Sequence, residues 1–468
     1  MYFNSFSFIV VYPIIFLMYY LIPARCLRLR NVYLLMASYV LYVFWNPVYS
    51  AVLFGITVVA YSVALALRCK EKRRKIIALG GALLVLFPLV AIKYSGFLAG
   101  VIEDVSTLYG MRVGLRGLNW IIPIGLSFYT LQAVSYLYDA YNDRVEAEKD
   151  FIVFALWLSF FPTVTMGPIT RAGDMLPQFK VRRPYFDYSK AVKGLRLLLW
   201  GMFMKVVVAD RSGIYVDTVY DNYQMFSGMT CFVTSIMYSI QIYSDFAGYS
   251  LMAIGIGNMI GFDIAENFNR PYFSQSVNEF WKRWHISLSS WLRDYIYIPL
   301  GGNREGSVKT YRNLLITFLI SGLWHGTDWS FMIWGATHAL WMILERLLYV
   351  SNTEERKLPK VLRILLTFMV VNLAWILFRL PTFHDARGFV HQMITTENVT
   401  EFRGPATITI CMALFLLIKD FIDEYYPNRI LVLNSNHRII RWGAYICLIC
   451  LIVLEGVLDS GQFIYGNF

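Results

Sequence analysis

The dominant feature of this sequence is a series of long apolar runs separated by short polar connections. An α-helix needs about 20 mostly apolar residues to cross a bilayer, whose core satisfies no backbone polar group. The length rule therefore predicts an all-α polytopic membrane protein with about 11 crossings, plus re-entrant or interfacial helices. The candidate spans lie near 4–22, 32–45, 48–67, 76–92, 118–140, 151–166, 194–209, 229–262, 313–348, 361–380, 406–422 and 440–458.

The composition supports a membrane protein and excludes several classes of partner. Of the 468 residues, 57% are hydrophobic and only 16% are charged, whereas soluble domains carry charge on about a quarter of their positions. The net charge is +11, but the cations stand in short clusters between apolar runs, where they hold loops in the cytoplasm. We therefore expect membrane lipid, and not nucleic acid, as a partner. The six cysteines have no metal-ligand spacing, so we expect no metal site and no tightly bound cofactor.

The first third of the chain predicts its orientation. Basic residues occupy loops 24–31 and 68–75, on either side of the apolar run 32–67, which is too long for one span and is broken at Asn46-Pro47. The run should form a helical hairpin with both basic loops on one side, and the positive-inside rule makes that side cytoplasmic. Met1, one span earlier, then lies outside.

The longest polar insertion, residues 263–312, contains the stretch FWKRWHISLSSWLRDYIYIPLGGNR (280–304). At helical spacing, one face of this stretch carries Trp281, Trp284, His285 and Leu288. The other face carries the cations Lys282 and Arg283. The pattern predicts one amphipathic helix at the membrane interface, ended near Pro299. Trp and cations at an interface usually anchor, but anchoring does not explain His285.

His325 is the clearest ionisable residue inside an apolar run. It follows Leu314 by 11 residues, which is about 16 Å of helix, or roughly half the hydrocarbon thickness. Gly322, Gly326 and Asp328 beside it suggest a local break that lines a polar cavity, because irregular backbone cannot face lipid. A structural hydrogen bond between helices explains a lone intramembrane His equally well.

Two other buried polar residues are better explained by packing. His338 has the surroundings of an ordinary packed helix. Asp245 should accept hydrogen bonds in a structural network, from Ser244, Tyr249 or Ser250.

The residues by themselves favour no single chemistry. A buried neutral imidazole is suited to deprotonating a hydroxyl that then attacks a thioester. A channel or transporter that relays protons through such a His fits nearly as well.

Several long segments resemble the membrane-bound O-acyltransferase family. They are NFNRPYFSQSVNEFWKRWHISLSSWLRDYIYIPLGGNR (267–304) and SGLWHGTDWSFMIWGATHAL (321–340), with 123–139, 160–171, 241–250, 372–380 and the C-terminal FIYGNF in the same order. The sequence is most similar to the bacterial branch that contains the alginate O-acetylases and the teichoic acid D-alanyl transferases, with the alginate type closer. Leu251 and Gly466-Asn467 depart from the pattern, which leaves the acceptor open but not the family.

The resemblance implies one membrane domain over 1–468 with a central tunnel, built from N-terminal spans (1–120), a core (120–350) and C-terminal spans (351–468). It implies a bacterial inner-membrane enzyme that takes an acyl group from a cytoplasmic thioester, either acetyl-CoA or an acyl-phosphopantetheine carrier. The group passes to an acceptor outside, through an extracytoplasmic esterase-fold (SGNH-like) relay protein. The near-invariant His of the family corresponds to His325, the general base. Its more variable His corresponds to His285, which we expect to shape or polarise the thioester end.

We expect stretch 280–304 to wall the donor entrance as well as to anchor. Four cations there are candidates for binding the donor phosphate: Lys282, Arg283, Arg293 and Arg304. Four further residues are candidates for lining or supporting the tunnel: Trp284, Trp324, Asp328 and Asn267. The leading hypothesis is O-acetylation of an exported polysaccharide. D-alanyl transfer to teichoic acid, and a transporter or flippase with a polar midplane site, remain the alternatives.

Overall fold

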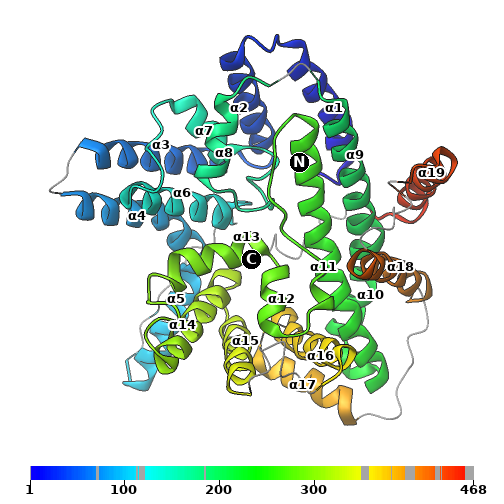
Figure 1. The fold of residues 1–468 in the computed structure, drawn as a ribbon. Helices are drawn as coiled ribbons and strands as arrows, with labels where there is room; N and C mark the ends of the chain where they lie inside the picture. The colour runs from blue at the N-terminus through cyan, green and yellow to red at the C-terminus, as the bar shows by residue number, and fades with distance from the viewer. Residues whose placement is uncertain are drawn as a thin grey trace. The chain divides into compact units, whose positions relative to one another are not determined.

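The computed structural model is helical, with no β-strand in the part of the chain that it describes (Figure 1). The described residues are 2–69, 73–111, 114, 122–183, 186–348, 358–380, 382–395, 406–426, 433 and 435–458. Lys70, Lys72 and the C-terminal FIYGNF, which the sequence arguments used, lie outside them. Three described helical segments are long and apolar enough to cross a membrane, namely Pro47–Arg68, Arg74–Leu108 and Lys360–Arg379. Phe6–Leu21 is apolar but shorter.

The chain divides into two compact units, each described here by itself. The first consists mainly of residues 1–194 and 256–265, and the second of residues 195–255 and 266–465. All the candidate site residues belong to the second unit.

The first unit contains the predicted hairpin. Its elements are α1 (Phe6–Leu21), α2 (Leu27–Val43), α3 (Pro47–Cys69), α4 (Arg74–Leu89), the π-helix η2 (Val90–Tyr94), α5 (Ser95–Leu108), α6 (Leu126–Tyr141), α7 (Phe151–Ser159) and α8 (Ala172–Lys180). The break falls at Asn46-Pro47, where the Asn46 side chain accepts a hydrogen bond from the Val48 N–H at 2.9 Å. However, Arg28 and Arg30 belong to the first turn of α2 and not to a loop.

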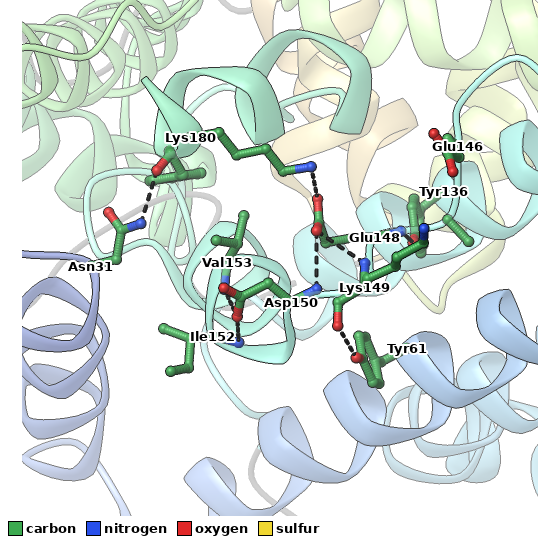
Figure 2. A network of polar contacts seen from close by, with 12 residues as sticks. Asn31, Tyr61, Tyr136, Glu146, Glu148, Lys149, Asp150, Ile152, Val153 and Lys180 are labelled. Atoms are coloured by element: carbon green, nitrogen blue, oxygen red, sulfur yellow. Dashed lines mark hydrogen bonds and ion pairs between the residues drawn. The ribbon is translucent and has the colours of Figure 1, made fainter. Parts of the chain in front are cut away.

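The candidate span at 151–166 is wrong as a single helix. Helix α7 has nine residues, about 14 Å at 1.5 Å per residue, and the chain from 160 to 170 is buried but irregular. The connection before α7 is fixed by Glu148, which is 6% exposed. Its carboxylate accepts the N–H groups of Lys149 and Asp150, both at 3.0 Å, and pairs with Lys180 at 2.6 Å (Figure 2).

Two ion pairs attach the end of α3 and the start of α4 to the same connection. Arg68 contacts Glu146 at 2.6 Å and Arg74 contacts Asp143 at 2.7 Å. Helices α3 and α4 lie side by side (Figure 1), so their basic ends lie beside residues 143–146.

The second unit carries the candidate site. Its elements are α9 (Tyr188–Met202, shared with the first unit), the π-helix η3 (Phe203–Ala209), α10 (Asp210–Asp221), η4 (Tyr223–Met225), α11 (Gly228–Met259), η5 (Pro271–Phe273), α12 (Val277–Arg283), α13 (Ile286–Leu292), the π-helix η6 (Arg293–Tyr297), α14 (Ser307–His325), α15 (Trp329–Leu347), α16 (Lys360–Arg379), α17 (Phe383–Thr395), α18 (Ala406–Tyr425) and α19 (Arg438–Glu455).

The long apolar run 313–348 forms two helices, α14 and α15, which lie side by side (Figure 1). Glycines allow their backbones to approach. A Cβ on Gly322 would collide with the Phe331 carbonyl oxygen, and one on Gly335 with the Phe318 carbonyl oxygen. Small residues at a helix contact permit this close packing. Gly322 therefore serves the packing of α14 against α15 and not the expected break.

Candidate functional site

The predicted single amphipathic helix around His285 is wrong. Helix α12 ends at Arg283, Trp284 is extended, and His285 has φ +42°, after which α13 begins at Ile286. Residues 267–269 lie beside the break and form backbone hydrogen bonds with the residues on either side of it. The Asn269 N–H donates to the Arg283 carbonyl oxygen, and the Ile286 N–H donates to the Asn267 carbonyl oxygen, both at 2.9 Å.

Asn267 is the centre of the polar contacts at this break, and it is only 1% exposed. Its Oδ1 accepts hydrogen bonds from the Ser287 N–H at 3.1 Å and from the Ser287 hydroxyl at 2.8 Å. The same oxygen lies 3.2 Å from Nδ1 of His285. Its Nδ2 donates to Ser250 Oγ on α11 at 3.1 Å. Asn267 thus caps α13 from outside the helix, because the first N–H groups of a helix have no partner within it.

His325 is the last residue of α14, so the predicted break beside it is present. Asp328 caps the next helix: its carboxylate accepts the Ser330 N–H at 3.1 Å. Between them Gly326 is extended, and a Cβ there would collide with the Phe331 ring. The helix end and the nearby acid, both expected from the sequence, are therefore explained by the packing of Gly326 against Phe331 and by the capping of α15 by Asp328.

The two candidate catalytic histidines share an aromatic environment. His285 is 0% exposed and His325 is 1% exposed. The Trp324 ring centroid lies 6.0 Å from that of His285 and 4.8 Å from that of His325. His325 also contacts Trp334 at 5.0 Å and Phe378 at 5.4 Å. Rings on several sides exclude bulk water, which strengthens any electrostatic interaction made there.

Trp284 and His338 complete the surrounding aromatic cluster. Trp284 is fully buried, with its ring centroid 5.0 Å from that of Trp375. His338 accepts a hydrogen bond from Trp281 Nε1 at 3.3 Å, which agrees with the packing role expected for it. Trp281 lies 5.7 Å from Trp334 between ring centroids, so a short series of rings leads from Trp281 to His325.

A cavity of about 320 Å³ lies between α12, α13, η6, α14 and α15. Trp281 and Ile286 are part of its wall, so it borders both the ring series to His325 and the residue after His285. Three cations line it, Lys282, Arg293 and Arg346. Two of them were predicted. Arg346 was missed, although it follows His338 by eight residues on α15 and therefore lies on the same helix face.

The other two predicted donor-binding cations do not line this cavity. Arg283 contacts Glu279 on the same helix at 2.7 Å and Glu424 on α18 at 3.0 Å. Arg270 joins Glu424 at 3.0 Å as well, so Arg283 belongs to a structural ion-pair cluster. Arg304 lies in the exposed turn after η6.

Sequence reasoning also missed two buried charged groups. Glu345 on α15 caps α12, accepting the Val277 N–H at 2.7 Å and the Asn278 N–H at 3.3 Å. Lys205 in η3 pairs with Asp245 and Asp210, both at 2.6 Å. Asp245 therefore has a structural partner, as expected, but the sequence did not indicate Lys205, which lies 40 residues away.

Comparison with known proteins identifies relatives over most of the chain. Residues 126–380 match the family model of MBOAT, membrane-bound O-acyltransferase family. A probable alginate O-acetylase of Pseudomonas aeruginosa is 38% identical over 438 residues, covering 91% of this chain and 82% of that protein. The peptidoglycan O-acetyltransferase of Helicobacter pylori is 34% identical over 429 residues, covering 85% and 80%. The teichoic acid D-alanyltransferase of Bacillus subtilis is 25% identical over 281 residues, covering 57% and 71%.

Proposed function

The chain belongs to the membrane-bound O-acyltransferase family, and we propose that it moves an acetyl group from a cytoplasmic thioester to a hydroxyl of an exported polysaccharide. The names of its relatives support this choice, since those with higher identity are called alginate or peptidoglycan O-acetylating enzymes. Both names describe acetyl transfer to a glycan. The direct acceptor is either the glycan or an extracytoplasmic esterase-fold relay protein.

The observation that carries the proposal is the pair of buried imidazoles beside Trp324, close to a cation-lined cavity. In the reaction, His325 takes the proton of the acceptor hydroxyl as the oxygen attacks the thioester carbonyl. The new C–O bond forms, the C–S bond breaks, and the departing thiolate takes the proton from His325. The imidazole is then neutral again, so one residue serves as base and then as acid.

The cavity is our proposed donor site. Lys282, Arg293 and Arg346 would hold a phosphate of CoA or of a phosphopantetheine carrier, since charge-assisted hydrogen bonds to phosphate are strong. The thioester arm would extend past Trp281 and Ile286 toward the imidazoles. The donor is a substrate, and its thiol product leaves after each turnover.

The cellular setting is part of the proposal. The enzyme lies in a bacterial inner membrane with Met1 outside, and the basic ends of α3 and α4 face the cytoplasm. The ion pairs of Arg68 and Arg74 then put residues 143–146 on the same side. Donor and acceptor would meet the protein from opposite faces of the membrane.

The testing experiment uses purified protein in liposomes, with labelled acetyl-CoA and an acetylated acceptor glycan as the measured product. We expect label transfer by the native protein, and transfer lowered by at least about 100-fold in His325→Gln. A D-alanyl carrier protein supplied instead should give no transfer, which addresses the alternative raised by the more distant relative. D-alanyl transfer without acetyl transfer would overturn the proposal.

A further inference from the structure

The orientation of the Asn267 carboxamide is fixed by a neighbour that can only donate. The backbone N–H of Ser287 lies 3.1 Å from the Asn267 side chain. A peptide N–H has no acceptor capacity, so the carboxamide atom facing it must be the oxygen. The amide nitrogen then faces Ser250 Oγ at 3.1 Å, which can accept its hydrogen bond.

This orientation determines which nitrogen of His285 carries a proton. Asn267 Oδ1 lies 3.2 Å from His285 Nδ1, and a carboxamide oxygen cannot donate. Nδ1 must therefore be the donor. In the neutral imidazole one nitrogen is protonated and the other holds a lone pair, so Nε2 is left as a hydrogen-bond acceptor.

Neighbouring contacts hold the Asn267 carboxamide and the His285 ring in this orientation. The main-chain oxygen of Asn267 also accepts the Ile286 N–H at 2.9 Å, so Asn267 holds the two residues that follow His285. His285 has φ +42°, a left-handed conformation that is costly for a residue with a side chain. Such a conformation persists where neighbouring contacts over-determine it, and Asn267 supplies four such contacts to residues 285–287.

We propose that Asn267 is a positioning residue that locks His285 in the Nδ1–H tautomer, so that Nε2 accepts a hydrogen bond from a substrate hydroxyl other than the one that His325 deprotonates. The identity of that hydroxyl rests on the proposed function, whereas the tautomer does not. The lock also changes the role expected for His285. A ring that polarises a thioester carbonyl must donate from the nitrogen facing it, and Nε2 of the neutral ring has no proton to donate.

The test is nitrogen NMR of the full-length protein in lipid nanodiscs with ¹⁵N-labelled histidine. The chain has only six His, so the His285 signals can be assigned by their loss in His285→Gln. We expect a protonated Nδ1 and an unprotonated Nε2. The opposite pattern in the native protein would overturn the proposal whatever the variants do.

Two variants then separate positioning from folding. Asn267→Asp keeps an oxygen toward Nδ1 and should keep the Nδ1–H signature, whereas Asn267→Ala should shift the ring toward the Nε2–H form. In the acetyl-transfer assay Asn267→Ala should lower kcat on the order of 10²-fold, with the KM for acetyl-CoA unchanged and partial recovery in Asn267→Asp. An Asn267→Ala ring that stays Nδ1–H would refute the lock. Absence of acetyl transfer in the native protein would instead refute the proposed function and leave the tautomer result intact.

Discussion

The Nζ of Lys205 lies 2.6 Å from Oδ1 of Asp245, and both side chains are only 2% exposed. Asp210 completes the cluster at the same distance. Burying three charges costs solvation free energy, which close pairing offsets. The cluster joins the π-helix η3, the start of α10 and the long helix α11, which also carries Ser250, the partner of Asn267.

Neutralising one member of this cluster should destabilise the protein strongly. Lys205→Met leaves two uncompensated buried carboxylates, and breaking a buried pair typically costs about 3–5 kcal/mol. We expect a large fall in the thermal unfolding midpoint in detergent micelles. The matched control is Lys309→Met, whose partner Glu305 is 50% exposed. An exposed pair contributes at most about 1 kcal/mol. Equal effects of the two substitutions would therefore contradict a stabilising role for the buried Lys205 cluster.

The two histidines should respond differently to substitution. His325→Gln keeps a hydrogen-bonding side chain but cannot take a proton, so transfer should fall by about 10²–10⁴-fold while thermal stability stays near native. His285→Ala should leave measurable residual transfer, because it removes an orienting contact and not the base. Activity is followed with labelled acetyl-CoA and stability by melting in detergent. An active His325→Gln protein would show that His325 is structural.

Substitutions at the cavity should act on donor binding. Lys282→Gln combined with Arg346→Gln should raise the KM for acetyl-CoA, and more so at low salt, because salt screens charge attraction. Arg304→Gln lies outside the cavity wall and is the matched control. Arg283→Gln should lower stability without changing this KM, since Arg283 pairs with Glu279 and Glu424. An unchanged KM in a double variant that inserts normally would show that these cations do not bind the donor and only set the membrane topology.

The orientation can be tested with single cysteines and a membrane-impermeant thiol reagent, on a background in which the native cysteines are replaced. Arg25→Cys, Lys75→Cys and Glu146→Cys should label only from the cytoplasmic side, and Asn46→Cys only from outside. The Glu146 position follows from its ion pair with Arg68. Labelling of positions 25 and 75 from opposite sides would show that the hairpin orientation is wrong.

Several parts of the fold and of the candidate site could be predicted because they depend on local pattern. The break at Asn46-Pro47 and the helix end at His325 follow from turn residues and a capping acid within a few positions. The break at His285 could not be predicted, because residues 280–292 have unbroken helical periodicity. It arises because backbone groups of Arg283 and Ile286 form hydrogen bonds with residues 267–269. The sequence pattern of 280–292 contains no sign of these bonds to a separate segment.

The sequence by itself determined the helical membrane class and the family, and it predicted the two histidines of the candidate site. Apolar run length, charge placement and long ordered motifs are properties of the chain read in order, so they need no contacts to be recognised. Only the tertiary structure decided how the charges divide: Lys282, Arg293 and Arg346 line the cavity, while Arg283 and Lys205 form structural ion pairs. It also decided the tautomer of His285. The reason is physical, since the role of a charge or an imidazole is set by partners within a few ångströms, and here those partners come from positions up to 141 residues away.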